Sequence, residues 1–116
     1  MNENDHIDRQ KALQWLEGDE RMFVKMKSMF LKNIPSQVGL LKEFLDAGDN
    51  TATERAAHTI MGSSAMLGAC GMSDEAREIE RSAIVGDIDS ARHRFIRFVE
   101  EYEKVMAELV AEVENL

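Results

Sequence analysis

The chain of 116 residues is poor in several residue types, and each shortage excludes a class of protein. Its one cysteine, Cys70, cannot form an internal disulfide, which excludes a scaffold built on disulfides. One proline and seven glycines leave few points at which a helix must stop. No stretch approaches the roughly 20 apolar residues of a membrane span. The polar start, Met1 to Lys11, lacks an apolar run, so no signal peptide is expected.

Positive charge is scarce as well. Lys and Arg number 14 against 22 Asp and Glu, which gives a formal net charge of -8 at pH 7. Binding to nucleic acid requires a basic surface, and an anionic membrane would repel this chain. We therefore expect the protein to bind neither nucleic acid nor membrane. The single cysteine suits a reducing cytoplasm, where we expect the protein as a monomer.

The residues that are abundant favour an all-helical fold. Hydrophobic residues make up 44% of the chain and aromatic residues only 6%, as in bundles filled by Leu, Ile, Met and Ala. We expect a single domain over residues 1–116, with a frayed start at 1–7. The predicted architecture is an up-and-down antiparallel four-helix bundle with a short additional N-terminal helix. The expected helical stretches cover residues 7–17, 19–33, 35–47, 50–68, 74–85 and 88–114.

Local signals set the expected helix ends. Gly18 ends the first helix, and Asp19 caps the second because its carboxylate accepts hydrogen bonds from free backbone amides. Ile34–Pro35 is expected to break the next helix, since proline disfavours helical geometry in the residue before it. Ser73 is the expected cap of the helix over 74–85. The apolar stripe expected for residues 19–33 consists of Met22, Met26, Met29 and Phe30.

One stretch, His58 to Gly68, carries the clearest functional signal. At about 100° per residue, Ile60 and Leu67 lie nearly opposite His58, so the imidazole is expected to face solvent. Gly62 follows one turn later, although glycine inside a helix costs about 1 kcal/mol relative to alanine. Such a glycine indicates close approach of another molecule to His58. The alternative is that Gly62 lets a neighbouring helix pack tightly and that His58 is a surface residue without a role.

This stretch resembles the signature of the histidine-containing phosphotransfer (HPt) domain family, H-x-[Leu/Ile]-[Lys/Arg]-G-[Ser/Ala]-[Ser/Ala]-x-x-[Leu/Ile/Val]-G. Met61 departs from the pattern. The similarity extends over roughly residues 8–108 and includes the Gly18–Glu20 turn and Glu80. The matching positions are His58, Ile60, Gly62, Ser63, Ser64, Leu67 and Gly68.

The resemblance implies that His58 accepts a phosphoryl group from a receiver-domain aspartyl phosphate and passes it to another receiver aspartate. The implied partners are response-regulator receiver domains and a hybrid sensor histidine kinase. In this family the Mg²⁺ and a catalytic lysine belong to the receiver, so we expect neither a metal site nor a cofactor here. Autonomous kinase activity is not expected either, because the sequence has no glycine-rich nucleotide loop.

Met61 replaces the lysine or arginine that family members place one turn after the histidine. The missing positive charge is expected from Arg55, one turn earlier, with Arg77 or Arg81 as further candidates. The alternative is that transfer is slowed and the domain acts partly by docking. A chain that only docks, as a non-transferring helical adaptor for a receiver or a histidine kinase, is the competing function.

The remaining candidates have simpler expected roles. Met61, Ala65 and Met66 are candidates for an apolar contact patch, or else the methionines pack between helices. Ser63 is expected to support the helix, as is Ser64. A hydrolase is disfavoured because only Glu54 lies near His58 in the sequence, so that no carboxylate is placed to orient the imidazole. Residues expected to be solvated are His6, His93, Glu100, Glu101, Glu103, Glu108, Glu112 and Glu114.

Overall fold

The computed structural model describes residues 6–114, with side chains to residue 111. This part of the chain is helical and contains no strand. None of its helices is long and apolar enough to cross a membrane. The helices are α1 (Arg9–Trp15), α2 (Glu20–Ala47), α3 (Asn50–Leu67), α4 (Cys70–Ile84) and α5 (Ile88–Glu114).

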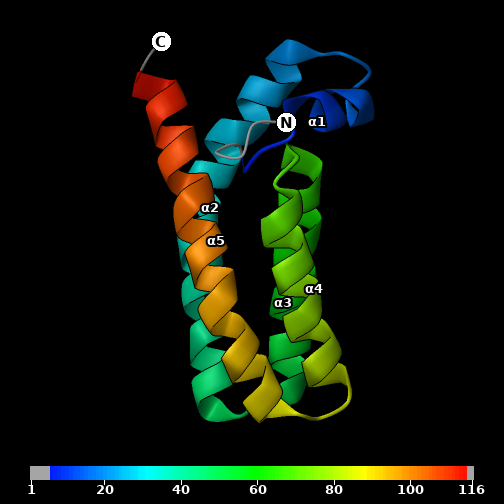
Figure 1. Ribbon diagram of the computed structural model, residues 1–116, viewed down its shortest axis with the longest axis vertical. Coiled ribbons are helices and arrows are strands. Elements are labelled where there is room, and N and C mark those ends of the chain that lie inside the picture. The colour runs from blue at the N-terminus through cyan, green and yellow to red at the C-terminus, as the bar shows by residue number, and fades with distance from the viewer. Residues whose placement is uncertain (1–5, 115–116) are drawn as a thin grey trace.

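Helices α2 to α5 run alternately up and down and form the predicted antiparallel four-helix bundle, and the short α1 lies across one end (Figure 1). The connections are tight because α2 and α3 each end at a glycine with positive φ, Gly48 at 69° and Gly68 at 85°. Glycine adopts this left-handed conformation without the steric penalty that other residues incur. Asp19 and Asp49 cap the starts of α2 and α3 by accepting from backbone amides.

The predicted helix break at Ile34–Pro35 is wrong, because α2 continues through Pro35. Proline removes one backbone hydrogen bond and strains the preceding turn. Pro35 itself is exposed, whereas Ile34 and Val38 on either side of it are buried in the core. Burial of the apolar face on both sides of the proline therefore outweighs the local preference for a break.

The core stripe of α2 also differs from the prediction. Phe23 and Phe30 are buried, but Met22 and Met29 are 43% and 54% exposed. Lys27 joins the buried face, and its ammonium group lies 5.1 Å from the centre of the Phe23 ring. The sequence analysis assigned the buried face of α2 to the wrong side, because the true face contains a lysine and the methionines beside it are more hydrophobic.

Helix α4 begins four residues earlier than predicted, at Cys70, so Ser73 is not its cap. Ser73 is buried and its hydroxyl donates to the Met61 carbonyl oxygen of α3 at 3.0 Å. This hydrogen bond joins the two helices that carry the candidate site.

Helices α4 and α5 pair along their length. Glu78 lies 4.0 Å from Arg94, and the Ser82 and Ser90 hydroxyls are 3.1 Å apart. Glu101 packs so closely on Gly71 that a Cβ there would lie 2.7 Å from its carboxylate. Glu101 is therefore partly buried, and the prediction that it is solvated is wrong. Glu112 and Glu114 were also predicted to be solvated, but their side chains lie outside the described part of the structure.

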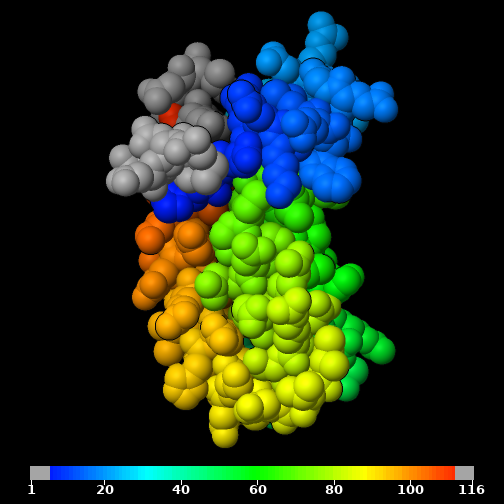
Figure 2. All heavy atoms as spheres, turned by 45° about the vertical axis from the view of Figure 1, so that its right-hand side comes forward, coloured from blue at the N-terminus to red at the C-terminus, as the bar shows by residue number. Residues whose placement is uncertain are grey.

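The N-terminal segment, residues 6–8, packs between the α3–α4 turn and α5 (Figure 2). The prediction of a frayed start is therefore wrong for residues 6 and 7. The Asp8 amide donates to the Gly68 carbonyl oxygen at 2.7 Å, and Ile7 is buried in the core. His6 is partly buried, not solvated: its backbone amide donates to Glu108 and its Nδ1 lies 3.5 Å from Glu101. Residues 1–5 of the predicted frayed start lie outside the described part of the chain.

Candidate functional site

His58 lies in the middle of α3 with 67% of its side chain exposed. Ile60 and Leu67, on the opposite face of the helix, are buried in the core, and so is the preceding residue, Ala57. The helical period of the sequence therefore placed the imidazole on the correct side of the bundle.

Glu80 of α4 supplies a partner that the sequence analysis missed. Its Oε2 lies 2.6 Å from His58 Nδ1, and only 15% of the Glu80 side chain is exposed. The expectation that no carboxylate is placed to orient the imidazole is thus wrong. The two residues are 22 positions apart, so only the packing of α4 on α3 brings them together. The one signal in the sequence was the place of Glu80 in the HPt resemblance.

The contact with Glu80 determines which nitrogen of the His58 ring carries the proton. An ionised carboxylate can only accept a hydrogen bond, so Nδ1 carries the proton. The other nitrogen, Nε2, then has a free lone pair, and no described residue forms a hydrogen bond to it. The partly buried Glu80 therefore holds an exposed imidazole in the tautomer that presents Nε2 to an incoming electrophile.

The surface beside the imidazole is open. A Cβ built on Gly62 would meet no atom within 4 Å, so Gly62 does not serve to admit a neighbouring helix. A hollow of about 410 Å³ adjoins the ring, and we refer to it as the His58 hollow. Its lining consists of Glu54, Arg55, His58, Thr59 and Glu80.

Of the three candidate cations, only Arg55 lines the His58 hollow. Within the described chain, no carboxylate lies within 4.0 Å of its guanidinium. Arg77 lies 3.8 Å from Asp74, and Arg81 lies 3.2 Å from Glu78, so each is paired on its own helix.

The apolar candidates separate into two groups. Met61 is partly buried and packs against the core, as the alternative for the methionines predicted. Met66 is 49% exposed and Ala65 is partly exposed, so both are accessible to a partner.

Of the two serines of the motif, only Ser63 bonds to the backbone, and the Ser64 hydroxyl has no hydrogen-bond partner in the described chain. The Ser63 hydroxyl donates to the Thr59 carbonyl oxygen at 3.0 Å, and Ser64 is fully buried. The Thr59 hydroxyl in turn donates to the Arg55 carbonyl oxygen at 3.1 Å. Hydroxyls engaged with the backbone in this way are not poised as nucleophiles.

Among residues 6–114, no group of three or more His, Cys, Asp or Glu side chains is arranged to hold a metal ion. That this domain uses no metal or other cofactor stays a prediction.

Comparison with known proteins identifies a family model and two solved structures that are similar to this chain. The family model of the Hpt domain matches residues 25–116. No curated protein sequence matches the chain. Two solved structures share its fold with a TM-score of 0.85, each over 96% of both chains. They are histidine-containing phosphotransfer protein B (HptB) from Pseudomonas aeruginosa PAO1, at 23% identity, and the HPT domain of a sensor hybrid histidine kinase from Shewanella, at 17%.

At these identities the two structures bear on the fold alone, whereas the family model bears on the sequence itself. That model spans most of the chain, including the whole of α3 and α4, and its family has a histidine phosphotransfer role in phosphorelays. The chain that carries this exposed imidazole and its partly buried glutamate partner therefore belongs to the Hpt domain family.

Proposed function

We propose that the protein accepts a phosphoryl group on His58 Nε2 from the aspartyl phosphate of one receiver domain and passes it to the aspartate of another. The observation that carries this proposal is the 2.6 Å contact between His58 Nδ1 and Glu80, which leaves Nε2 as the exposed nucleophile. The donor would be the receiver of a hybrid sensor histidine kinase and the acceptor a response regulator. We expect this exchange in the cytoplasm, with the protein as a monomer.

The transfer requires little chemistry from this chain. The Nε2 lone pair attacks phosphorus, the N–P bond forms, and the bond from phosphorus to the aspartate oxygen breaks, so the carboxylate leaves with its electron pair. Nδ1 keeps its proton, and the carboxylate of Glu80 balances the positive charge that develops on the ring. The reverse step on a second receiver regenerates the neutral imidazole.

Arg55 is our candidate for the positive charge that Met61 cannot provide. It lines the same hollow as His58, whereas Arg77 and Arg81 are paired with carboxylates of their own helix. A guanidinium there would attract the equatorial oxygens of the phosphoryl group and lengthen the life of the phosphohistidine. Mg²⁺ is expected on the receiver only.

A hydrolase is not favoured, although a carboxylate does orient the imidazole. A His–Glu pair needs a nucleophile or an activated water to act on an ester or amide. Thr59, the one hydroxyl residue in the lining of the His58 hollow, is engaged with the Arg55 carbonyl oxygen.

The test is incubation with a receiver domain that carries radiolabelled phosphate on its aspartate. We expect acid-labile, base-stable label to appear on the wild-type chain, to be absent from His58→Gln, and to move to a second, unlabelled receiver. Binding of the phosphorylated receiver without any label on His58 would instead identify the non-transferring adaptor.

A further inference from the structure

Glu54 is a charged residue beside His58 that the proposed transfer does not use. It precedes His58 by four residues on α3, so the two side chains lie on the same face of the helix, one turn apart. Both line the His58 hollow, and Glu54 is partly buried there. Within the described chain, the Glu54 side chain forms no hydrogen bond and has no cation within 4.0 Å. Its negative charge is therefore not neutralised by a close partner.

The lining of the His58 hollow carries more negative than positive charge. Glu54 and Glu80 contribute two carboxylates, whereas Arg55 is the one cation of the lining. The imidazole of His58 is neutral when Nδ1 alone carries a proton. The hollow thus has a surplus of negative charge before any phosphoryl group arrives.

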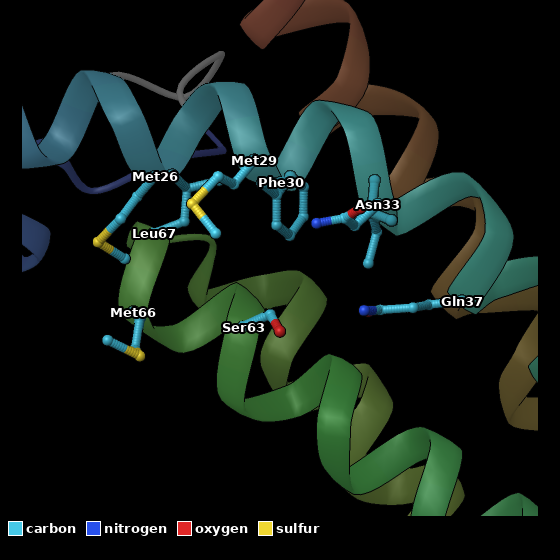
Figure 3. A pocket seen from close by; sticks show the side chains of 9 residues that line it. Met26, Met29, Phe30, Asn33, Gln37, Ser63, Met66 and Leu67 are labelled. Carbon is cyan, nitrogen blue, oxygen red and sulfur yellow. The ribbon is translucent and has the colours of Figure 1, made fainter.

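The rest of α3 does not offset this surplus. Every residue of α3 after His58 is neutral, and Met61 stands where the family places Lys or Arg. In Figure 3 this half of the helix lines a hollow of about 190 Å³ beside α2. None of the residues that line that second hollow is charged. The C-terminal half of α3 therefore supplies no cation to oppose Glu54.

We propose that Glu54 keeps the phosphoryl group on His58 labile, so that the protein passes the group on rather than storing it. This inference rests on the proposed function, since it concerns the same phosphohistidine. A phosphoryl group on Nε2 brings up to two negative charges into the hollow, and Glu54 repels them across one helical turn. The repulsion raises the free energy of the phosphohistidine and shifts the equilibrium of transfer toward the phosphorylated receiver.

The bond that Glu54 weakens joins Nε2 to phosphorus. When a receiver aspartate attacks, its oxygen bonds to phosphorus, the N–P bond breaks, and the electron pair returns to Nε2. With water as the attacking group the product is inorganic phosphate, which keeps both hydrogens of the water. Nδ1 keeps its proton throughout, beside Glu80. Because the transition state is loose, the repulsion is partly relieved as the N–P bond lengthens, and both reactions become faster.

The first experiment measures the lifetime of the phosphohistidine without a receiver. The chain is phosphorylated on His58 with phosphoramidate, freed of reagent, and followed by ³¹P NMR. Two negative charges about 7 Å from a third in a medium close to water predict a lifetime about three- to tenfold longer in Glu54→Gln. Glu54→Lys should lengthen it further, and Glu54→Asp should stay within twofold of wild type.

The matched control is Glu100→Gln, which removes the same charge from an exposed position on α5, outside the lining of the hollow. Its lifetime should equal that of the wild type. Arg55→Ala should change the lifetime in the opposite direction, because it removes the one cation of the lining. A lifetime in Glu54→Gln that equals or falls below that of the wild type would overturn the proposal.

Salt distinguishes the effect of charge from a structural role of Glu54. The screening length falls from about 30 Å at 0.01 M salt to about 3 Å at 1 M. The wild-type lifetime should therefore approach that of Glu54→Gln as salt is added, to within twofold at 1 M. A difference that stays the same at 1 M salt would also overturn the proposal.

The second experiment mixes the phosphorylated chain with an unphosphorylated receiver. The fraction of phosphate left on His58 at equilibrium should rise about three- to tenfold in Glu54→Gln and stay unchanged in Glu100→Gln. If phosphoramidate does not label wild-type His58, or the label does not move to the receiver, phosphotransfer itself is contradicted. If the wild type is labelled and transfers, but Glu54→Gln behaves as the wild type, only the role of Glu54 is contradicted.

Discussion

The backbone of Asp8 lies directly against Gly68, where its amide donates to the Gly68 carbonyl oxygen at 2.7 Å and its own carbonyl occupies the place of a Cβ. Gly68→Ala should therefore destabilise the protein by about 2–4 kcal/mol, from left-handed strain and from displacement of the N-terminal segment. Urea denaturation followed by circular dichroism measures the loss.

The matched control is the other glycine of the motif, Gly62. Gly62→Ala meets no atom within 4 Å and lies inside α3, so it should raise the free energy of unfolding by about 0.5–1 kcal/mol. The added methyl group stands beside His58, so transfer from a receiver should slow. A stabilised variant with unimpaired transfer would show that Gly62 has no role in partner approach.

Glu80 should control the rate of phosphotransfer through its hydrogen bond to His58. A hydrogen bond to a charged group contributes about 1.5–3 kcal/mol, so Glu80→Ala should slow phosphorylation of His58 by roughly 10- to 100-fold. Glu80→Gln keeps an acceptor for Nδ1–H but not the charge, and should fall between Ala and wild type. Rapid-quench kinetics with a phosphorylated receiver measures both. Equal rates in all three proteins would rule out an orienting role.

Arg55→Ala should shorten the lifetime of the phosphohistidine and slow its formation, because the variant removes the cation from the His58 hollow. We expect roughly a tenfold effect, with partial recovery in Arg55→Lys. Arg77→Ala is the control, since that guanidinium is paired with Asp74. Lifetime and rate equal to wild type in Arg55→Ala would exclude Arg55 as the source of charge.

Pro35 should be a stability defect that the bundle tolerates. Proline inside a helix costs about 3 kcal/mol relative to alanine, and Pro35 is exposed, so its replacement disturbs no core contact. Pro35→Ala should raise the free energy of unfolding by about 1–3 kcal/mol in urea denaturation. A lower free energy would show that α2 depends on the proline for its path.

The features that the sequence predicted are those set by neighbours along one helix. The helical period correctly predicted that His58 is exposed, and Asp19 correctly predicted the start of α2. The features that it missed depend on packing between helices. Glu80 meets His58 only through the α3–α4 pair, and Ser73 turns to Met61 rather than to its own helix end. Likewise, the local rule at Pro35 failed because Ile34 and Val38 are buried on both sides of it.

The hydrogen bond from His6 to Glu108 joins residues 102 positions apart, which has a consequence for the order of folding. Helices α3 and α4 adjoin in sequence and meet across a two-residue turn, so their pair closes at little entropic cost. The bond of His6 to Glu108 can form only after α5 has docked, and it lies at the edge of the described chain. We expect amide hydrogens near His6 to exchange first in the native protein, while the hairpin that carries His58 and Glu80 stays closed.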